Sequence, residues 1–462
     1  MMHFSRRDFI QNTALGTLAA AIPVRSITAD AQEKRPNIIF IMVDDMGYHD
    51  LGCYGSKTIQ TPEIDKMCSE GVKFTDCYSG ASVCAPARST LMTGYHIGHT
   101  PVRGNNGGTP LFPEDITVAE VLKKADYVTG GFGKWGLGNH GKQGAAEKQG
   151  FDLFFGYYNQ WHAHDYYTSH LFRNSERVEL NGFSHYVIYD ETVKFIKESA
   201  KSGKPFFCYC PWTPPHDKYE IPEDDPAWAL YKDKPWHDNP EIVAKLEAMP
   251  DVQVKKAKIV AAFDTMIDRQ VGEILKLLKE LGIDDNTIVF FTSDNGAARR
   301  WPGIHESCGE LKGRKGSKFE GGIRVPMVVR WPGMIKAGSE SGLPWYFPDV
   351  MPTLAELAGV SKKVPKHTDG ISVVPTLLGK GRQKKHEYLF WKDAIRMGKW
   401  KGLGKPGNLS LYDLSKDIGE ENNLAEKHPE IAAKLSRFME EAWTEPRSQK
   451  SDGKYTGREE EP

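Results

Sequence analysis

The stretch Ser82-Val83-Cys84-Ala85-Pro86-Ala87-Arg88-Ser89-Thr90-Leu91-Met92-Thr93-Gly94 is the most informative part of this chain. Pro86 suits the first turn of a helix, so the pattern predicts a helix from Ala85 onward with Cys84 at its N-terminal edge. Backbone N–H groups and the helix dipole favour an anion at such an edge. The alternative is a buried cysteine that precedes an ordinary helix.

Two pairs of oxygen-bearing side chains follow apolar runs elsewhere in the chain. Residues 35–43 are β-branched and apolar and end in Asp44-Asp45, and residues 287–292 precede Asp294-Asn295. Buried strands of this kind deliver their C-terminal loops to one edge of an α/β sheet, where ligand sites collect. Hard oxygen ligands suit Ca²⁺ or Mg²⁺ rather than zinc. Each pair taken alone is also a common turn sequence.

Apolar runs alternate with helical patterns through most of the chain. This alternation predicts an α/β fold with a large, mixed, mostly parallel sheet sandwiched by helices. After a helical pattern at residues 350–358, short strand patterns and a last helix predict a smaller C-terminal antiparallel α+β subdomain. Further strands are expected at residues 127–132, 205–209 and 325–330, further helices at 117–124, 189–202 and 252–282, and the C-terminal elements at 387–391, 394–397, 399–403, 409–412 and 429–443.

Length and composition are ordinary for a soluble globular protein. The chain has 462 residues, of which 39% are hydrophobic and 26% charged, and its 60 Lys and Arg nearly balance 61 Asp and Glu. No global basic field therefore argues for nucleic acid. The seven cysteines form no metal-binding spacing, and both disulfides after export and free buried cysteines remain open. We divide the chain into a signal peptide (1–31), a catalytic domain (32–360), a C-terminal subdomain (361–450) and a disordered tail (451–462).

Residues 1–31 have the features of a twin-arginine signal peptide. Ser5-Arg6-Arg7-Asp8-Phe9-Ile10 precedes a weakly apolar run at residues 13–22, and Ala29-x-Ala31 offers a cleavage site. The apolar run is too short to cross a bilayer, so we expect no membrane span in the mature chain. We expect export by the Tat translocase to the periplasm or the exterior of a bacterial cell. A frayed amphipathic N-terminus is the alternative.

The Cys-x-Pro-x-Arg core at residues 84–88, closed by Thr93-Gly94, resembles the activation motif of the type I (formylglycine-dependent) sulfatases, an arylsulfatase-like family of the alkaline phosphatase superfamily. The segments around Lys134 (Gly133-Lys134-Trp135) and Lys315 (Gly313-Arg314-Lys315-Gly316) resemble two lysine-bearing elements of the same family. The resemblance covers most of the chain. It implies that Cys84 is oxidised to formylglycine (3-oxoalanine) by a formylglycine-generating or anaerobic sulfatase-maturating enzyme.

The resemblance also implies sulfuric ester hydrolysis of a sulfated carbohydrate or aryl sulfate, as in polysaccharide degradation. The formylglycine hydrate, oriented by Arg88, would attack sulfur beside one Ca²⁺, with Mg²⁺ as second choice, while His216 protonates the leaving alcohol. The implied metal ligands are Asp44, Asp45, Cys84, Asp294 and Asn295; the implied catalytic residues are Cys84, Arg88, Lys134, His164, His216 and Lys315; and the implied substrate-binding residues are Arg103, Lys134, His162, His216 and Lys315.

One position departs from the family pattern. Gly136 stands where many sulfatases have a histidine that contacts the formylglycine hydrate and helps to expel sulfate. The segment Gln160-Trp161-His162-Ala163-His164-Asp165 offers replacements. We rank His164 ahead of His162 and His140, with sugar recognition or a surface position as the alternative for each.

Two other functions remain open alongside sulfate ester hydrolysis. One is a phosphonate or phosphate ester hydrolase of the same superfamily. The other is a noncatalytic, sulfated-glycan-binding protein, which only the departure at Gly136 supports. The sugar, the sulfate position, exo or endo action and the oligomeric state are also open. Arg103 and the aromatic side chains of Trp161, Trp212 and Trp301 near the motif-bearing loops suit a sulfated carbohydrate.

Overall fold

A ten-stranded sheet forms the centre of the computed structural model, which describes residues 35–105, 110–233, 239–301 and 304–447. Strands β9, β1, β8, β4 and β5 run parallel, and antiparallel strands flank them on both sides. This confirms the predicted mixed, mostly parallel sheet. The predicted signal peptide and C-terminal tail lie outside the described residues. In sheet order the strands are β11 (Ser339–Ser341), β2 (Val72–Phe74), β10 (Met327–Arg330), β9 (Thr287–Ser293), β1 (Asn37–Val43), β8 (Phe206–Trp212), β4 (Val128–Lys134), β5 (Leu153–Tyr157), β6 (His170–Arg173) and β7 (Glu176–Glu179).

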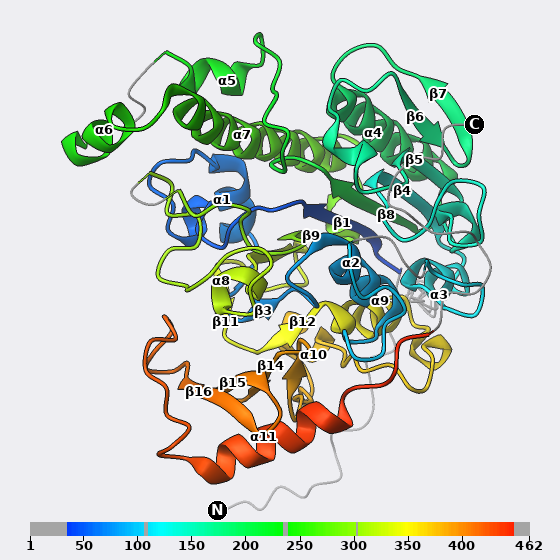
Figure 1. Ribbon diagram of the computed structural model, residues 1–462. Helices are drawn as coiled ribbons and strands as arrows, with labels where there is room; N and C mark the ends of the chain where they lie inside the picture. Colours follow the sequence, from blue (N-terminus) through cyan, green and yellow to red (C-terminus); the bar gives the residue numbers. More distant parts are fainter. Residues whose placement is uncertain (1–34, 106–109, 234–238, 302–303, 448–462) are drawn as a thin grey trace, which may run out of the picture. The chain divides into compact units, whose positions relative to one another are not determined.

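Helices cover both faces of this sheet because its central strands are apolar on both sides. Along β1, Ile38, Phe40 and Met42 pack with α2 and α9, whereas Ile39 and Ile41 pack with α4 and α7 (Figure 1). Successive side chains of a strand point to opposite faces, so an uninterrupted apolar run requires a cover on each. The larger helices are α1 (Pro62–Ser69), α2 (Cys84–Thr93), α4 (Ser184–Ser202), α6 (Pro240–Glu247), α7 (Asp251–Glu280), α9 (Val350–Leu357) and α11 (Pro429–Glu441); the shorter ones are α3 (Val118–Lys123), α5 (Pro226–Tyr231), α8 (Glu320–Ile323) and α10 (Val374–Leu378).

The helices expected from the sequence all form, with shifted ends. Helix α4 begins at Ser184, five residues before the expected start, and α7 spans Asp251–Glu280. Across the described ranges, no helix is both long enough and apolar enough to cross a bilayer.

A smaller antiparallel sheet follows, as predicted. Its strands are β13 (Leu389–Phe390), β14 (Ala394–Met397), β15 (Trp400–Lys405) and β16 (Asn408–Asp413), and α11 packs on it. Lys401 on β15 is fully buried and lies 2.8 Å from both Glu320 and Glu420. Since Glu320 begins α8, the ion pair between Lys401 and Glu320 ties the small sheet to this helix. Strands β3 (Cys77–Tyr78) and β12 (Trp345–Tyr346) form a separate two-stranded parallel sheet, and their tyrosines share a hydrophobic cluster with side chains of the small sheet.

Asp264 is an acidic side chain on the buried face of α7. It is fully buried, and neither carboxylate oxygen has a hydrogen-bond partner within the described part of the chain. Burial and, second, the nearby Asp50 carboxyl raise the pKa of Asp264 well above its usual range. The folded protein therefore keeps a proton here that the unfolded chain releases near pH 4.

This proton makes stability fall as pH rises. The folded-state pKa is raised, so the contribution of Asp264 is intact below about pH 4 and is lost as pH rises through the folded pKa, at about 1.4 kcal/mol per unit of pKa shift. We expect Asp264→Asn to unfold at a higher temperature than the parent at pH 8 and at a similar temperature at pH 4.5. Thermal unfolding at both pH values tests this, with Glu198→Gln on the exposed face of α4 as control. An equal change in unfolding temperature at both pH values would contradict it.

Candidate active site

Cys84 begins helix α2 and points its side chain into the interior. Val83 before it is extended and its side chain makes no capping hydrogen bond. Asn105 Oδ1 instead accepts from the Ala85 N–H at 2.8 Å. The Cys84 thiol is 1% exposed and donates to Asp44 Oδ1 at 3.1 Å. An acidic side chain therefore faces the cysteine at the edge of the helix.

Neighbouring parallel strands bring the two predicted oxygen-bearing pairs together. Val43 of β1 and Ser293 of β9 are partners in register, so the residues after them leave the sheet side by side. The Asp45 N–H donates to Asp294 Oδ1 at 3.3 Å, and Asn295 Nδ2 donates to Asp45 Oδ1 at 2.7 Å. The site thus forms where the carboxyl ends of parallel strands meet, as the sequence predicts.

Three cations from distant segments face these carboxylates. Arg88 of α2 lies 2.8 Å from Asp294 and 3.2 Å from Asp44. Lys134, the last residue of β4, lies 2.6 Å from Asp44. Lys315, in the loop before α8, lies 2.6 Å from Asp45. Arg88 and Lys134 are fully buried, so each positive charge is held by a carboxylate within ion-pair distance.

The negative charges of the carboxylates in this cluster repel one another, and this repulsion affects their pKa values. Burial raises the pKa of Asp44, but Lys134, His216 and Arg88 outweigh burial and hold that pKa well below its usual range. Burial and the Asp44 carboxylate raise the pKa of Asp294 to about 6. A divalent cation between these groups would favour the charged form of both.

The carboxylate and amide oxygens of this cluster fit a hard divalent cation, whereas the Cys84 thiol and the His216 imidazole are softer donors. One potential ligand atom from each of Asp44, Asp45, Cys84 and His216 lies within 4.8 Å of the others. Asn295 Oδ1 is buried and has no hydrogen-bond partner in the described part of the chain, so its lone pairs are available to a metal. Carboxylate and amide oxygens are the ligands of Ca²⁺ and Mg²⁺.

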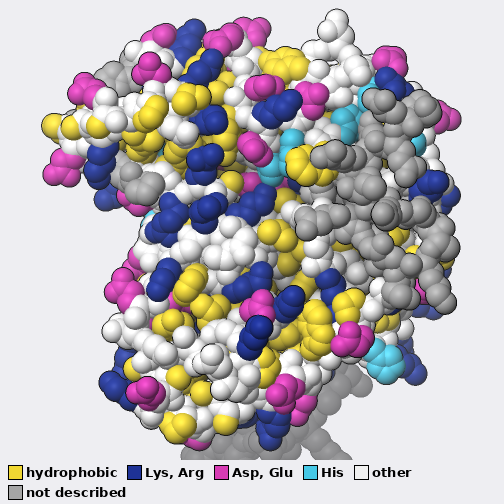
Figure 2. Space-filling model, in the orientation of Figure 1, with side chains coloured by type: hydrophobic (Ala, Val, Ile, Leu, Met, Phe, Trp, Pro, Cys, Tyr) yellow, Lys and Arg dark blue, Asp and Glu magenta, His cyan; other side chains and the backbone are white. Residues whose placement is uncertain are grey.

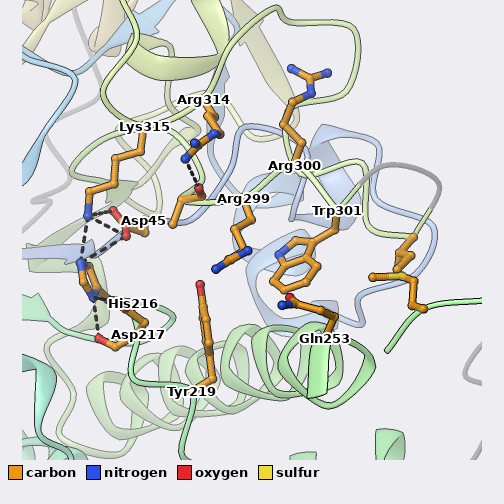
Figure 3. Close-up of a pocket in the computed structure, with 13 residues that line it drawn as sticks. Asp45, His216, Asp217, Tyr219, Gln253, Arg299, Arg300, Trp301, Arg314 and Lys315 are labelled. Atoms are coloured by element: carbon orange, nitrogen blue, oxygen red, sulfur yellow. Dashed lines mark hydrogen bonds and ion pairs between the residues drawn. The ribbon is translucent and has the colours of Figure 1, made fainter. Parts of the chain in front are cut away.

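His216 links the acidic cluster to an open pocket (Figure 3). It follows β8, and its Nε2 lies 2.9 Å from Lys315 Nζ, while its Nδ1 lies 2.6 Å from Asp217 Oδ1. Burial lowers the pKa of His216, but Asp45 and then Asp44 outweigh burial and raise it to about 10. In the absence of a metal ion, these two carboxylates therefore favour the protonated imidazole. The ring of His164 stacks on it, with centroids 3.9 Å apart.

Comparison with known proteins places this geometry in a family. Residues 36–360 match the Sulfatase family model, and residues 314–445 match the model of the N-sulphoglucosamine sulphohydrolase C-terminal region. The chain belongs to the sulfatase family.

Known sulfatases resemble it over most of their length. The chain is 31% identical to human N-acetylgalactosamine-6-sulfatase over 411 residues, covering 82% of this chain and 72% of that protein. It is 31% identical to human arylsulfatase A over 468 residues, covering 88% of each. The crystal structure of Ps i-CgsB in complex with k-i-k-neocarrahexaose matches with a TM-score of 0.75 and 29% identity, covering 89% of this chain and 93% of that one. These relatives confirm a sulfatase hydrolase with the alkaline phosphatase fold.

The other predicted site residues of this sulfatase do not all reach the cluster. His162 Nε2 lies 2.8 Å from Thr168 Oγ1, and the ring of His140 stacks on Phe172. Arg103 donates to Thr444 and lies over the Trp443 ring at 4.8 Å. Of the three candidate histidines, the structure brings only His164 into contact with His216.

The space beside Gly136 is filled by Gln160, which sequence reasoning did not single out. Gly136 has φ +75°, and a Cβ there would stand 1.9 Å from Gln160 Nε2 and 3.9 Å from Arg88 Cδ. The Gln160 side chain is buried, and neither its oxygen nor its nitrogen has a hydrogen-bond partner in the described chain. The sequence does not indicate that Gln160 fills this space, because Gly136 and Gln160 are brought together only by the pairing of β4 with β5.

We expect Gly136→Ala to destabilise the sulfatase more than Gly141→Ala. Both glycines have a positive φ, of +75° and +70°, but only Gly136 is crowded, since nothing lies within 4 Å of a Cβ at Gly141. The shared backbone strain costs about 1 kcal/mol, and the clash with Gln160 adds to it. Thermal unfolding of both variants measures the difference. Adding Gln160→Ala to Gly136→Ala should remove the excess, and an excess that persists would contradict this account.

Proposed function

We propose that this sulfatase removes sulfate from a sulfated carbohydrate, with Cys84, converted to formylglycine, as the residue that bears the nucleophile. One observation carries the proposal: the Cys84 side chain lies where the carboxylates and cations converge. Burial, followed by the Asp294 and Asp44 carboxylates, raises the pKa of the Cys84 thiol. A protonated thiol is a poor nucleophile, so this environment argues against direct use of the sulfur.

The side chains around Cys84 have different proposed roles in sulfate transfer. Asp44, Asp45, Asp294 and Asn295 would hold Ca²⁺, which would polarise sulfate oxygens and neutralise the developing charge. Hydrated formylglycine would supply a hydroxyl nucleophile at position 84. Lys134 and Lys315 would place positive charge beside the sulfate oxygens, and Arg88 holds the carboxylates by two ion pairs.

His216 is the proposed acid for the leaving alcohol. Its Nδ1 is held by Asp217, which leaves Nε2 directed at the cluster and the pocket beside Lys315. His164, stacked on its ring, has a pKa lowered to about 2 by burial and then by Lys134 and His216. His164 is therefore neutral near pH 7 and a weak base, and we assign to it a contact with the formylglycine hydrate in place of the family histidine absent at Gly136.

A sulfated sugar is the proposed substrate because relatives named N-acetylgalactosamine-6-sulfatase share most of this chain. The proposal includes maturation of Cys84 by a formylglycine-generating or anaerobic sulfatase-maturating enzyme. It also includes export through the twin-arginine signal to the periplasm or beyond.

Parallel assays on 4-methylumbelliferyl sulfate, the matching phosphate and a phosphonate ester test this function. We expect the sulfate ester to be the preferred substrate by kcat/KM. A preference for the phosphate or phosphonate would favour the other hydrolase of the superfamily, and no turnover by protein whose Cys84 carries the aldehyde would overturn the proposal. Labelling with an aldehyde-reactive hydrazide, with Cys84→Ala as blank, establishes whether the tested protein is converted.

A further inference from the structure

A pocket of about 770 Å³ opens beside the sulfate-binding groups. Asp45, His216 and Lys315 form one wall, and Arg299, Trp301 and Arg314 lie farther out (Figure 3). Sulfate needs only a small part of this volume, which is within the range that holds a drug-sized or sugar-sized ligand. Because the pocket is continuous with His216, the group that leaves with the alcohol oxygen must occupy it.

The outer part of the pocket carries positive charge that the protein does not neutralise. Both acidic side chains that line the pocket are already paired, Asp45 with Lys315 and Asp217 with His216. By contrast, no carboxylate of the described residues forms an ion pair with Arg299 or Arg314, and both side chains are exposed. Figure 2 shows Lys and Arg side chains gathered in the hollow between α7 and α8.

The two arginines are held so that they face the cavity. Arg314 Nη1 donates to the Ala298 carbonyl at 2.9 Å, which fixes its stem and leaves its other N–H groups available. Arg299 lies over the Trp301 ring at 5.7 Å and beside the Tyr219 hydroxyl. In contrast, the guanidinium of Arg300 donates hydrogen bonds to the backbone carbonyls of three loop residues and points away from the pocket.

We infer that Arg299 and Arg314 form a subsite for a second anionic group on the substrate, so that this sulfatase prefers sugars with an anion in addition to the sulfate that is removed. The inference rests on the proposed function. A guanidinium matches sulfate and carboxylate with two parallel hydrogen bonds, and either group would satisfy this chemistry.

Competitive inhibition of 4-methylumbelliferyl sulfate hydrolysis tests the subsite without knowledge of the natural sugar. The probes are galactosamine and glucosamine 6-sulfates, their disulfated forms, and sulfated disaccharides with the uronate carboxyl intact or reduced to the alcohol. We expect dianionic probes to inhibit about tenfold or more better than monoanionic ones, since a charged hydrogen bond contributes about that factor. Comparing the disulfated probes with the uronate-containing probes shows whether the second anion is a sulfate or a carboxylate. If protein whose Cys84 carries the aldehyde does not hydrolyse the fluorogenic ester at all, the proposed function fails and not only the subsite.

The ratio of inhibition constants in variants decides the assignment. Arg299→Ala with Arg314→Ala should bring the ratio between dianionic and monoanionic probes close to one, and lysine at both positions should restore part of it. Arg382→Ala, an exposed arginine outside the pocket, should leave both the ratio and the basal turnover unchanged. A preference that survives the double alanine variant, or equal inhibition by all probes in the parent, would overturn the inference.

Discussion

Cys84→Ala is expected to abolish sulfate ester hydrolysis while the fold survives. Loss of the residue that bears the nucleophile typically costs on the order of 10⁴-fold or more in kcat. The thiol contributes one hydrogen bond, to Asp44, and Asp44 keeps its ion pairs with Arg88 and Lys134. The unfolding temperature should therefore change by only a few degrees.

Steady-state turnover of 4-methylumbelliferyl sulfate measures this effect, and two variants sharpen it. Cys77→Ala removes a thiol that is equally buried, on β3, but lies outside the carboxylate cluster, and it should keep most of the activity. Cys84→Ser should be nearly inactive if the modifying enzyme accepts only cysteine. Residual turnover of Cys84→Ala above about 1% of the parent would show that position 84 does not carry the nucleophile.

The arrangement of the site could be predicted where the fold itself sets it. Asp44 and Asp294 follow strands whose apolar character is continuous, and parallel neighbours end at the same edge of a sheet. Lys134 ends another such strand. The long apolar stripe of α7 likewise predicted a core helix, with ends within two residues. Lys315, in a loop, was predictable only through its family resemblance.

The contacts of residues that lie in loops could not be predicted from the sequence. His162 and His164 both stand in a short 3-10 turn, and side chains two positions apart on a helical turn do not face the same way. The sequence ranked His164 ahead of His162, but the motif could not show that His164 reaches His216 while His162 contacts Thr168. Short strands such as β3, with two residues, lack the length to show a period. Arg299 and Arg314, exposed and in loops, belong to no periodic pattern.

Removing bound metal is expected to suppress activity by about 10³-fold or more, since a metal supplies several kcal/mol of charge stabilisation in such a site. Prolonged dialysis against EGTA followed by Ca²⁺ or Mg²⁺ tests this through turnover. A second readout does not depend on activity: Ca²⁺ at 100 times its Kd should stabilise the folded protein by about 2.7 kcal/mol. Ca²⁺ should act at lower concentration than Mg²⁺, because its flexible coordination tolerates a larger set of oxygen ligands.

Asp294→Asn distinguishes a metal site from a purely structural ion-pair cluster. In the metal-free protein the charge of Asp294 is disfavoured, because burial and Asp44 raise its pKa to about 6. The metal-free variant should therefore unfold close to the metal-free parent, yet gain little or nothing from Ca²⁺. Asp126→Asn removes an exposed carboxylate at a positive-φ position that asparagine tolerates, and it should keep the full Ca²⁺ effect. If Asp294→Asn were stabilised by Ca²⁺ as much as the parent, the carboxylates at the ends of β1 and β9 would serve only to hold Arg88 and the lysines.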